Sequence, residues 1–187
     1  MLSKLIDDTF NAVTAAIKGT DNVLDALRKS IKDQVTGSLA DVSDMSNSGM
    51  DMVVAIVTGG VKSVGNVGKS VAEVTRSTVG AAIKGVTEVG GDVVSAAKNA
   101  ASGAINGAAE VGEDLGQTAV AAVQGAIDTA EEVGTNTTDA VKASVMGVVS
   151  AATKVGGTAL ETVREALLSA AALPRDVIES VLKGSDK

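Results

Sequence analysis

The chain has 187 residues, a formal net charge of −7, one Phe, one Pro, and no Trp, Tyr, His or Cys. Without His and Cys it lacks the commonest metal ligand, the commonest general base and any disulfide. Its sixteen Lys and Arg residues are dispersed, whereas phosphate binding needs clustered positive charge, so we expect no nucleic-acid partner. We also predict no catalytic, cofactor-binding or metal-binding residues, and therefore a protein that is not an enzyme.

A 22-residue unit, itself composed of two imperfect 11-residue halves, runs through most of the chain. Each half makes three helical turns, so a hydrophobic pattern with this period stays on one face of an α-helix. The sequence therefore predicts an all-α fold of long amphipathic helices, packed as a right-handed or near-straight bundle or as an extended assembly. The clearest copies and the earliest one in phase begin at Ala15, Gly59, Ala81, Gly103, Gly125 and Gly147.

In chain order, four segments differ in composition. Residues 1–36 are expected to form an amphipathic helix that is richer in Leu and charge. Residues 37–58 form an irregular repeat, with a break predicted near 43–50. Residues 59–157 hold the regular Gly/Ala/Val repeats. Residues 158–187 are expected to form a C-terminal capping helix segment that breaks near Pro174, because proline disfavours a helix interior.

When each unit is wound as a helix, small, aliphatic and charged side chains separate into three stripes. Small residues at i and i+4 let helix backbones approach closely, so we expect the small stripe to be a packing surface between helices. Its members are Gly37, Gly59, Ala81, Gly85, Gly103, Gly107, Gly125 and Gly147. The aliphatic stripe is expected to be the apolar interface, represented by Val61, Val67, Ile83, Val89, Ile105, Val111, Ile127, Val133, Val149 and Val155.

The charged stripe is expected to face water, with acid and base pairs three or four residues apart. Examples are Lys84 with Glu88 and Glu73 with Arg76. A glycine costs up to about 1 kcal/mol in a helix interior relative to alanine, so a lone helix of this sequence is expected to be unstable. Folding should therefore depend on association, either with other copies of the chain or with an apolar surface.

A second series of glycines suggests helix ends within each unit. Gly commonly follows a helix, and Ser, Thr, Asp and Asn are preferred N-caps, which together predict a stack of helices of about 20 residues. The hydrophobic phase nevertheless continues through these points without a jump, and on that ground we expect long helices. The glycines and the residues two positions later are Gly68, Gly90, Gly112, Gly134 and Gly156, with Ser70, Asp92, Asp114, Asn136 and Thr158.

Two short motifs have simpler explanations than the functions they suggest. Residues 65–70 end like a phosphate-binding P-loop, but the position of its first glycine is Ser63 and no strand pattern precedes it. The triplet that begins at Asn136 fits a glycosylation acceptor, but a polar helix start accounts for it equally.

The repeat around Lys84-Gly85-Val86 resembles the 11-residue amphipathic repeats of the synucleins and perilipins. The resemblance covers about residues 15–168 as a pattern, although the Lys-Thr-Lys-Glu core of those repeats is missing. It implies a peripheral helix on a membrane or lipid droplet. The 11-residue repeats of late embryogenesis abundant proteins offer a lower-ranked reading, a stress-protectant repeat protein, since those proteins are far more hydrophilic.

Taken together, these patterns predict a non-catalytic structural protein that self-assembles through Gly/Ala-lined helix packing into a coat, scaffold or filament. Its partner would be itself, as a homo-oligomer, with a lipid or membrane surface as a further partner. The alternative is a peripheral lipid-surface protein. The start of the chain lacks a signal peptide, and the longest uncharged runs fall short of the roughly 18 residues that cross a bilayer, so a cytoplasmic or peripheral membrane location is expected.

Overall fold

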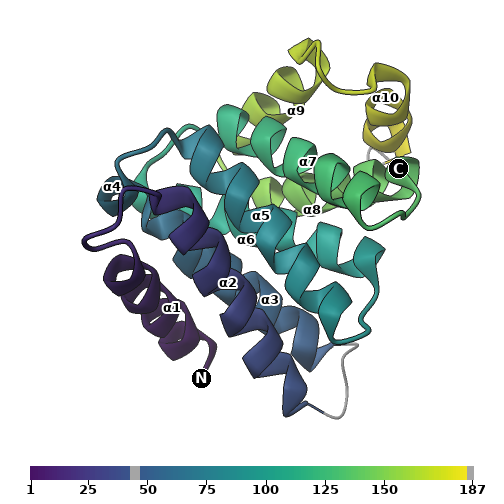
Figure 1. Ribbon diagram of the computed structural model, residues 1–187. Helices are drawn as coiled ribbons and strands as arrows, with labels where there is room; N and C mark the ends of the chain where they lie inside the picture. The colour runs from purple at the N-terminus through teal and green to yellow at the C-terminus, as the bar shows by residue number, and fades with distance from the viewer. Residues whose placement is uncertain (43–46, 185–187) are drawn as a thin grey trace.

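The computed structural model describes residues 1–42 and 47–184, which form α-helices and no strand (Figure 1). The all-α prediction is confirmed. Part of the predicted break near 43–50 lies outside the described residues. The helices are α1 (Leu2–Ala16), α2 (Val23–Ala40), α3 (Ser48–Lys62), α4 (Val64–Val67), α5 (Val71–Glu88), α6 (Val93–Val111), α7 (Leu115–Glu132), α8 (Thr137–Val155), α9 (Ala159–Ser169) and α10 (Arg175–Gly184).

The helices form two layers, and successive long helices alternate between them. In one layer α1, α3, α6 and α8 pack side by side in that order; in the other, α2, α5, α7 and α9 do the same. Helix α10 packs on α8 and α9 at the far end from α1 and α2. The chain is therefore a stack of antiparallel helix pairs, with one pair at each end contacting neighbours on one side only.

The expectation of long helices that run through several units is wrong. Helices α5 to α8 have 18 or 19 residues each, so one repeat unit makes one helix and one turn. The second glycine series provides the turns, because all five of its members adopt positive φ values between 70° and 80°. Positive φ values are readily available only to glycine, so these residues end the helices.

Hydrogen bonds at the turns stabilise these helix ends. The amide of Glu113 donates to the carbonyl of Ala108 at 2.9 Å, the long bond of a Schellman motif, and the turns after α5 and α7 have equivalent bonds. The next helix then begins with a side-chain cap. Ser70 and Glu73 form a capping box, Asp92 accepts from the Ser95 amide, and Asp114 and Asn136 cap α7 and α8. Thr158 precedes α9 without a side-chain cap bond.

The core is built from many small and medium side chains. Its largest fully buried members include Leu27, Ile31, Ile56, Ile83 and Ile105, and most of the rest are Val and Ala. Some buried threonines satisfy their hydroxyls within their own helices, as Thr129 does by donating to the Gly125 carbonyl at 2.8 Å. Within the described ranges, no helix is both long and apolar enough to cross a membrane.

Candidate interaction surfaces

The small stripe lies at contacts between alternate helices inside the chain. A Cβ atom added at Gly103 would lie 2.6 Å from the carbonyl oxygen of Val54, and one added at Gly125 would lie 2.8 Å from that of Arg76. In both cases the carbonyl belongs to the residue 49 positions earlier, on the preceding helix of the same layer. The repeated register indicates one packing contact used again and again along the array.

The other members of the stripe follow the same plan, with one exception. Gly59, Gly85, Gly107 and Gly147 all contact an earlier helix, and Ala81 is buried. Gly37 is exposed, and a Cβ added there would meet nothing within 4 Å. The exception has a simple reason: Gly37 lies in α2, and no described helix precedes α1 and α2 in the array.

The predicted apolar interface lies mainly within the core. The buried members are Val61, Val67, Ile83, Ile105 and Val149, and the partly buried members packed against the core are Val89, Ile127 and Val133. Two members are exposed instead, Val111 at 41% and Val155 at 44%. Each of these two is the last residue of its helix, next to a glycine turn, where the core no longer covers it.

Ion pairs join neighbouring helices of a layer. Lys62 on α3 lies 2.8 Å from Glu110 on α6, and Lys84 on α5 pairs with Glu132 on α7. The second pair is the first pair moved along the chain by one repeat unit, which places equivalent pairs in the two layers.

In the expected pairs Lys84–Glu88 and Glu73–Arg76, each side chain contacts another residue instead, which in three of the four cases lies on another helix. Lys84 pairs with Glu132 rather than Glu88, and Glu88 instead accepts from Lys32 of α2 at 2.8 Å. Arg76 binds Asp128 of α7 at 2.6 Å, while Glu73 bonds Ser70. The physical reason is the close approach of the helices across small residues, which brings carboxylates of the next helix within reach. A pattern of charges three or four residues apart does not predict these contacts. The signal in the sequence is the Lys62 and Glu110 pair, which recurs one repeat unit later as Lys84 and Glu132.

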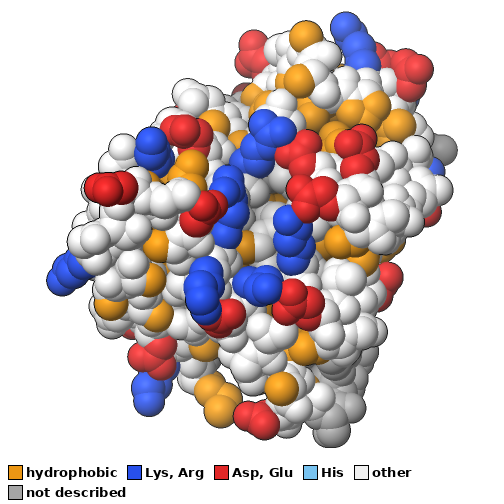
Figure 2. Space-filling model, in the orientation of Figure 1, with side chains coloured by type: hydrophobic (Ala, Val, Ile, Leu, Met, Phe, Trp, Pro, Cys, Tyr) orange, Lys and Arg blue, Asp and Glu red, His pale blue; other side chains and the backbone are white. Residues whose placement is uncertain are grey.

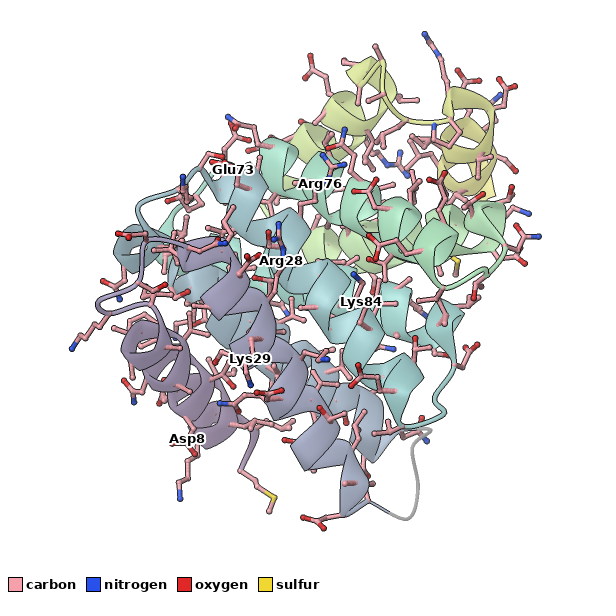
Figure 3. The ribbon with its side chains drawn as sticks, in the orientation of Figure 1. Asp8, Arg28, Lys29, Glu73, Arg76 and Lys84 are labelled. Carbon is pink, nitrogen blue, oxygen red and sulfur yellow. The ribbon has the colours of Figure 1, made fainter. Side chains whose placement is uncertain are left out.

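A groove runs along α5 between α2 and α7 and has a volume of about 1050 Å³. Small side chains of α5 at its base, those of Ser77, Gly80 and Ala81, leave room for the groove. Arg28, Lys29, Arg76 and Lys84 are among its basic residues and are labelled in Figure 3, and Figure 2 shows Lys and Arg side chains next to Asp and Glu side chains on the same face.

The charges of this groove balance. Five basic and five acidic side chains line it, so the net charge of −7 belongs to the rest of the chain. The hydrogen bond with Glu88 raises the pKa of Lys32, and the hydrogen bonds with Ser70 lower the pKa of Glu73, so both shifts favour the charged forms. The groove therefore has charged residues of both signs along its sides and small residues at its base.

Two smaller grooves lie elsewhere. One, of about 460 Å³, crosses the outer face of α1, α3, α6 and α8, and Leu2, Ile6, Val54 and Val155 give it an apolar lining. The other, of about 570 Å³, lies between α1 and α2 at the N-terminal end of the array.

Both short motifs of the sequence lie at helix ends. Gly68 of the P-loop-like stretch terminates the one-turn helix α4, and Ser70 caps α5. Asn136 caps α8 by accepting from the amides of Thr138 and Asp139. Helix termination and capping therefore account for these residues.

Comparison with known proteins supports the architecture alone. No family model and no curated protein matches the chain. Among solved structures, a de novo designed helical repeat protein is similar, with a TM-score of 0.53 and 14% identity over 98% of this chain and 95% of that one. At this identity the likeness establishes a helical repeat fold and carries no function.

Proposed function

We propose that this protein is a non-catalytic structural protein that associates with copies of itself into a coat, scaffold or filament. Support comes from the repeated contact between a glycine and the carbonyl 49 positions earlier, which joins the long helices from α3 to α8 in one regular register. No described helix precedes α1 and α2, and there Ala15 and Gly37, which occupy the small position of their repeat units, are exposed. This uncovered edge is the observation that carries the proposal of self-association.

Self-association would use other surfaces than the small stripe. Most of the small stripe is already covered by helices of the same chain, so contacts between copies have to use outer faces or ends of the array. Because the apolar stripe is mostly buried within one chain, we expect folding without a partner.

Sedimentation velocity over a wide range of protein concentration tests the proposal, with circular dichroism on the same samples. We expect species heavier than 18.4 kDa that increase with concentration, and helix content that stays constant on dilution. A protein that sediments as a monomer at every concentration would refute self-association. Helix that disappears on dilution would refute the internal burial described above.

A second candidate, a lipid-surface protein, is favoured by one observation. Leu2 and Val155 are 43% and 44% exposed, and both line the apolar groove on the outer face of α1, α3, α6 and α8. Its apolar side chains are suited to shallow contact with an acyl boundary, and Lys154, Asp51 and Glu110 also line it. Flotation with neutral and anionic vesicles tests this candidate. Binding that Leu2→Asp and Val155→Asp abolish would support it, and absence of binding by the unchanged protein would reject it.

A further inference from the structure

The groove between α1 and α2 forms the outer edge of the array. It has a volume of about 570 Å³ and is lined by Ala16, Ala26, Lys29, Ser30, Asp33 and Gln34. Helices α1 and α2 pack on α3 and α5 from the other side, so none of the described helices lies over this edge (Figure 1).

The same positions one helix pair later are covered by a helix. Residues 44 positions after Ala16, Ser30 and Gln34 are Gly60, Val74 and Thr78, and all three are buried. A Cβ atom added at Gly60 would lie 2.6 Å from Cδ1 of Ile31 in α2, so a helix rests directly on this position. The groove between α1 and α2 is therefore equivalent in sequence position to a surface of α3 and α5 that another helix of the chain covers.

Polar residues distinguish the edge from its buried counterpart. Ser30 and Gln34 replace Val74 and Thr78, so the edge is stable in water and is suited to reversible rather than permanent contact. Its rim has an ion pair within α2, in which Lys29 Nζ lies 2.5 Å from Asp33 Oδ2. Both side chains are well exposed, at 77% and 54%.

This ion pair is complementary to itself. If two α2 helices meet antiparallel about a twofold axis, Lys29 of each copy faces Asp33 of the other. An antiparallel register that placed Lys29 against Lys29 would be repulsive, so the charges favour the antiparallel register in which Lys29 faces Asp33. At the other end of the array, α10 already covers α8, which opposes head-to-tail continuation of the stack.

From these observations we propose that the groove between α1 and α2 binds a second copy of this chain, edge to edge, in a closed twofold dimer. The inference rests on the proposed self-association and identifies the surface that performs it. A larger coat or filament would then be built from such dimers through a different face.

Charge reversal within α2 tests this arrangement by sedimentation equilibrium of the full chain. Lys29→Glu places a carboxylate against the partner's Asp33 at each of the two symmetric contacts, and we expect the dimer dissociation constant to rise at least about tenfold. The exchange of both charges, Lys29→Asp with Asp33→Lys, should restore it to within about threefold of the original. Arg175→Glu is the matched control, since it reverses an exposed i,i+4 pair in α10, and it should leave the dimer unchanged.

A steric variant provides an independent test. Ser30→Arg places a long side chain in the groove and should weaken the dimer to a similar extent, whereas Ser180→Arg on the exposed face of α10 should have no effect. Thermal unfolding of each variant verifies that it is folded.

The outcomes separate this inference from the proposed function. A monomeric unchanged protein would overturn both. Association that neither Lys29→Glu nor Ser30→Arg weakens would overturn this interface and leave self-association standing. Weakening by Lys29→Glu that the charge exchange fails to restore would overturn the twofold pairing of Lys29 with Asp33.

Discussion

Replacing Gly103 by alanine should destabilise the protein, whereas the same change at Gly37 should stabilise it. At Gly103 the new methyl would lie 2.6 Å from the Val54 carbonyl oxygen and 3.0 Å from Val57 Cβ, so α3 and α6 must move apart. Overpacking of this kind lowers the free energy of unfolding by about 1 to 3 kcal/mol, and the higher helix propensity of alanine raises it by about 1 kcal/mol. At Gly37 nothing lies within 4 Å of the new methyl, so only the favourable propensity of about 1 kcal/mol remains.

Urea and thermal unfolding of both variants measure the difference. We expect Gly103→Ala to lower the free energy of unfolding by about 1 kcal/mol and Gly37→Ala to raise it by about 1 kcal/mol. For a chain of this length, their difference of about 2 kcal/mol corresponds to roughly 4 to 8 °C in melting temperature. Equal stabilisation by both changes would refute the reasoning, because it would mean that the glycine at 103 is not required by helix contact.

Three further predictions concern caps and charges. Asp92→Ala should lower the free energy of unfolding by about 1 kcal/mol at neutral pH, because the carboxylate of Asp92 caps α6. Hydrogen bonds with Ser95 lower the pKa of Asp92 in the folded state, so its contribution is present above the ordinary carboxyl pKa and is lost as pH falls. Urea unfolding of Asp92→Ala and the unchanged protein should therefore converge below about pH 4. For the exposed pair of Lys84 with Glu132, a double-mutant cycle with Lys84→Met and Glu132→Gln should give a coupling below about 1 kcal/mol that decreases in high salt. A coupling several times larger would contradict its placement at the surface.

The all-helical character of the chain could be predicted because an 11-residue period fits α-helical turns and cannot fit a strand. The glycines of the packing stripe could also be located, since their phase is fixed within each unit. What the sequence could not establish is whether a small residue meets a helix of the same chain or of another copy. Gly103 and Gly37 occupy the stripe alike, and only their different distances from neighbouring helices separate them.

The positions of the helix breaks differ from the prediction for an identifiable reason. An uninterrupted hydrophobic phase predicts long helices, but the glycine and cap residues are the stronger signal and end each helix within its unit. Gly112 illustrates the point: its φ of 72° ends α6, and Asp114 starts α7 two residues later. The phase survives such turns because every unit has the same length and the same turn, so each helix presents the same side to the core.

The same regularity explains a difference between the two repeats: the sequence unit is one helix with its turn, whereas the structural unit is a pair of helices, one from each layer. Consecutive helices run in opposite directions in opposite layers, and yet they carry equivalent contacts. Lys62 pairs with Glu110 in one layer, and one unit later Lys84 pairs with Glu132 in the other. Each helix thus has the same relation to the helix two units before it, whichever layer it occupies. Every long helix repeats this contact with the preceding helix of its layer, so a sequence unit of one helix and one turn is sufficient to build the stack. Helices α1 and α2 have no described helix before them, and for this reason Ala15 and Gly37 stay exposed.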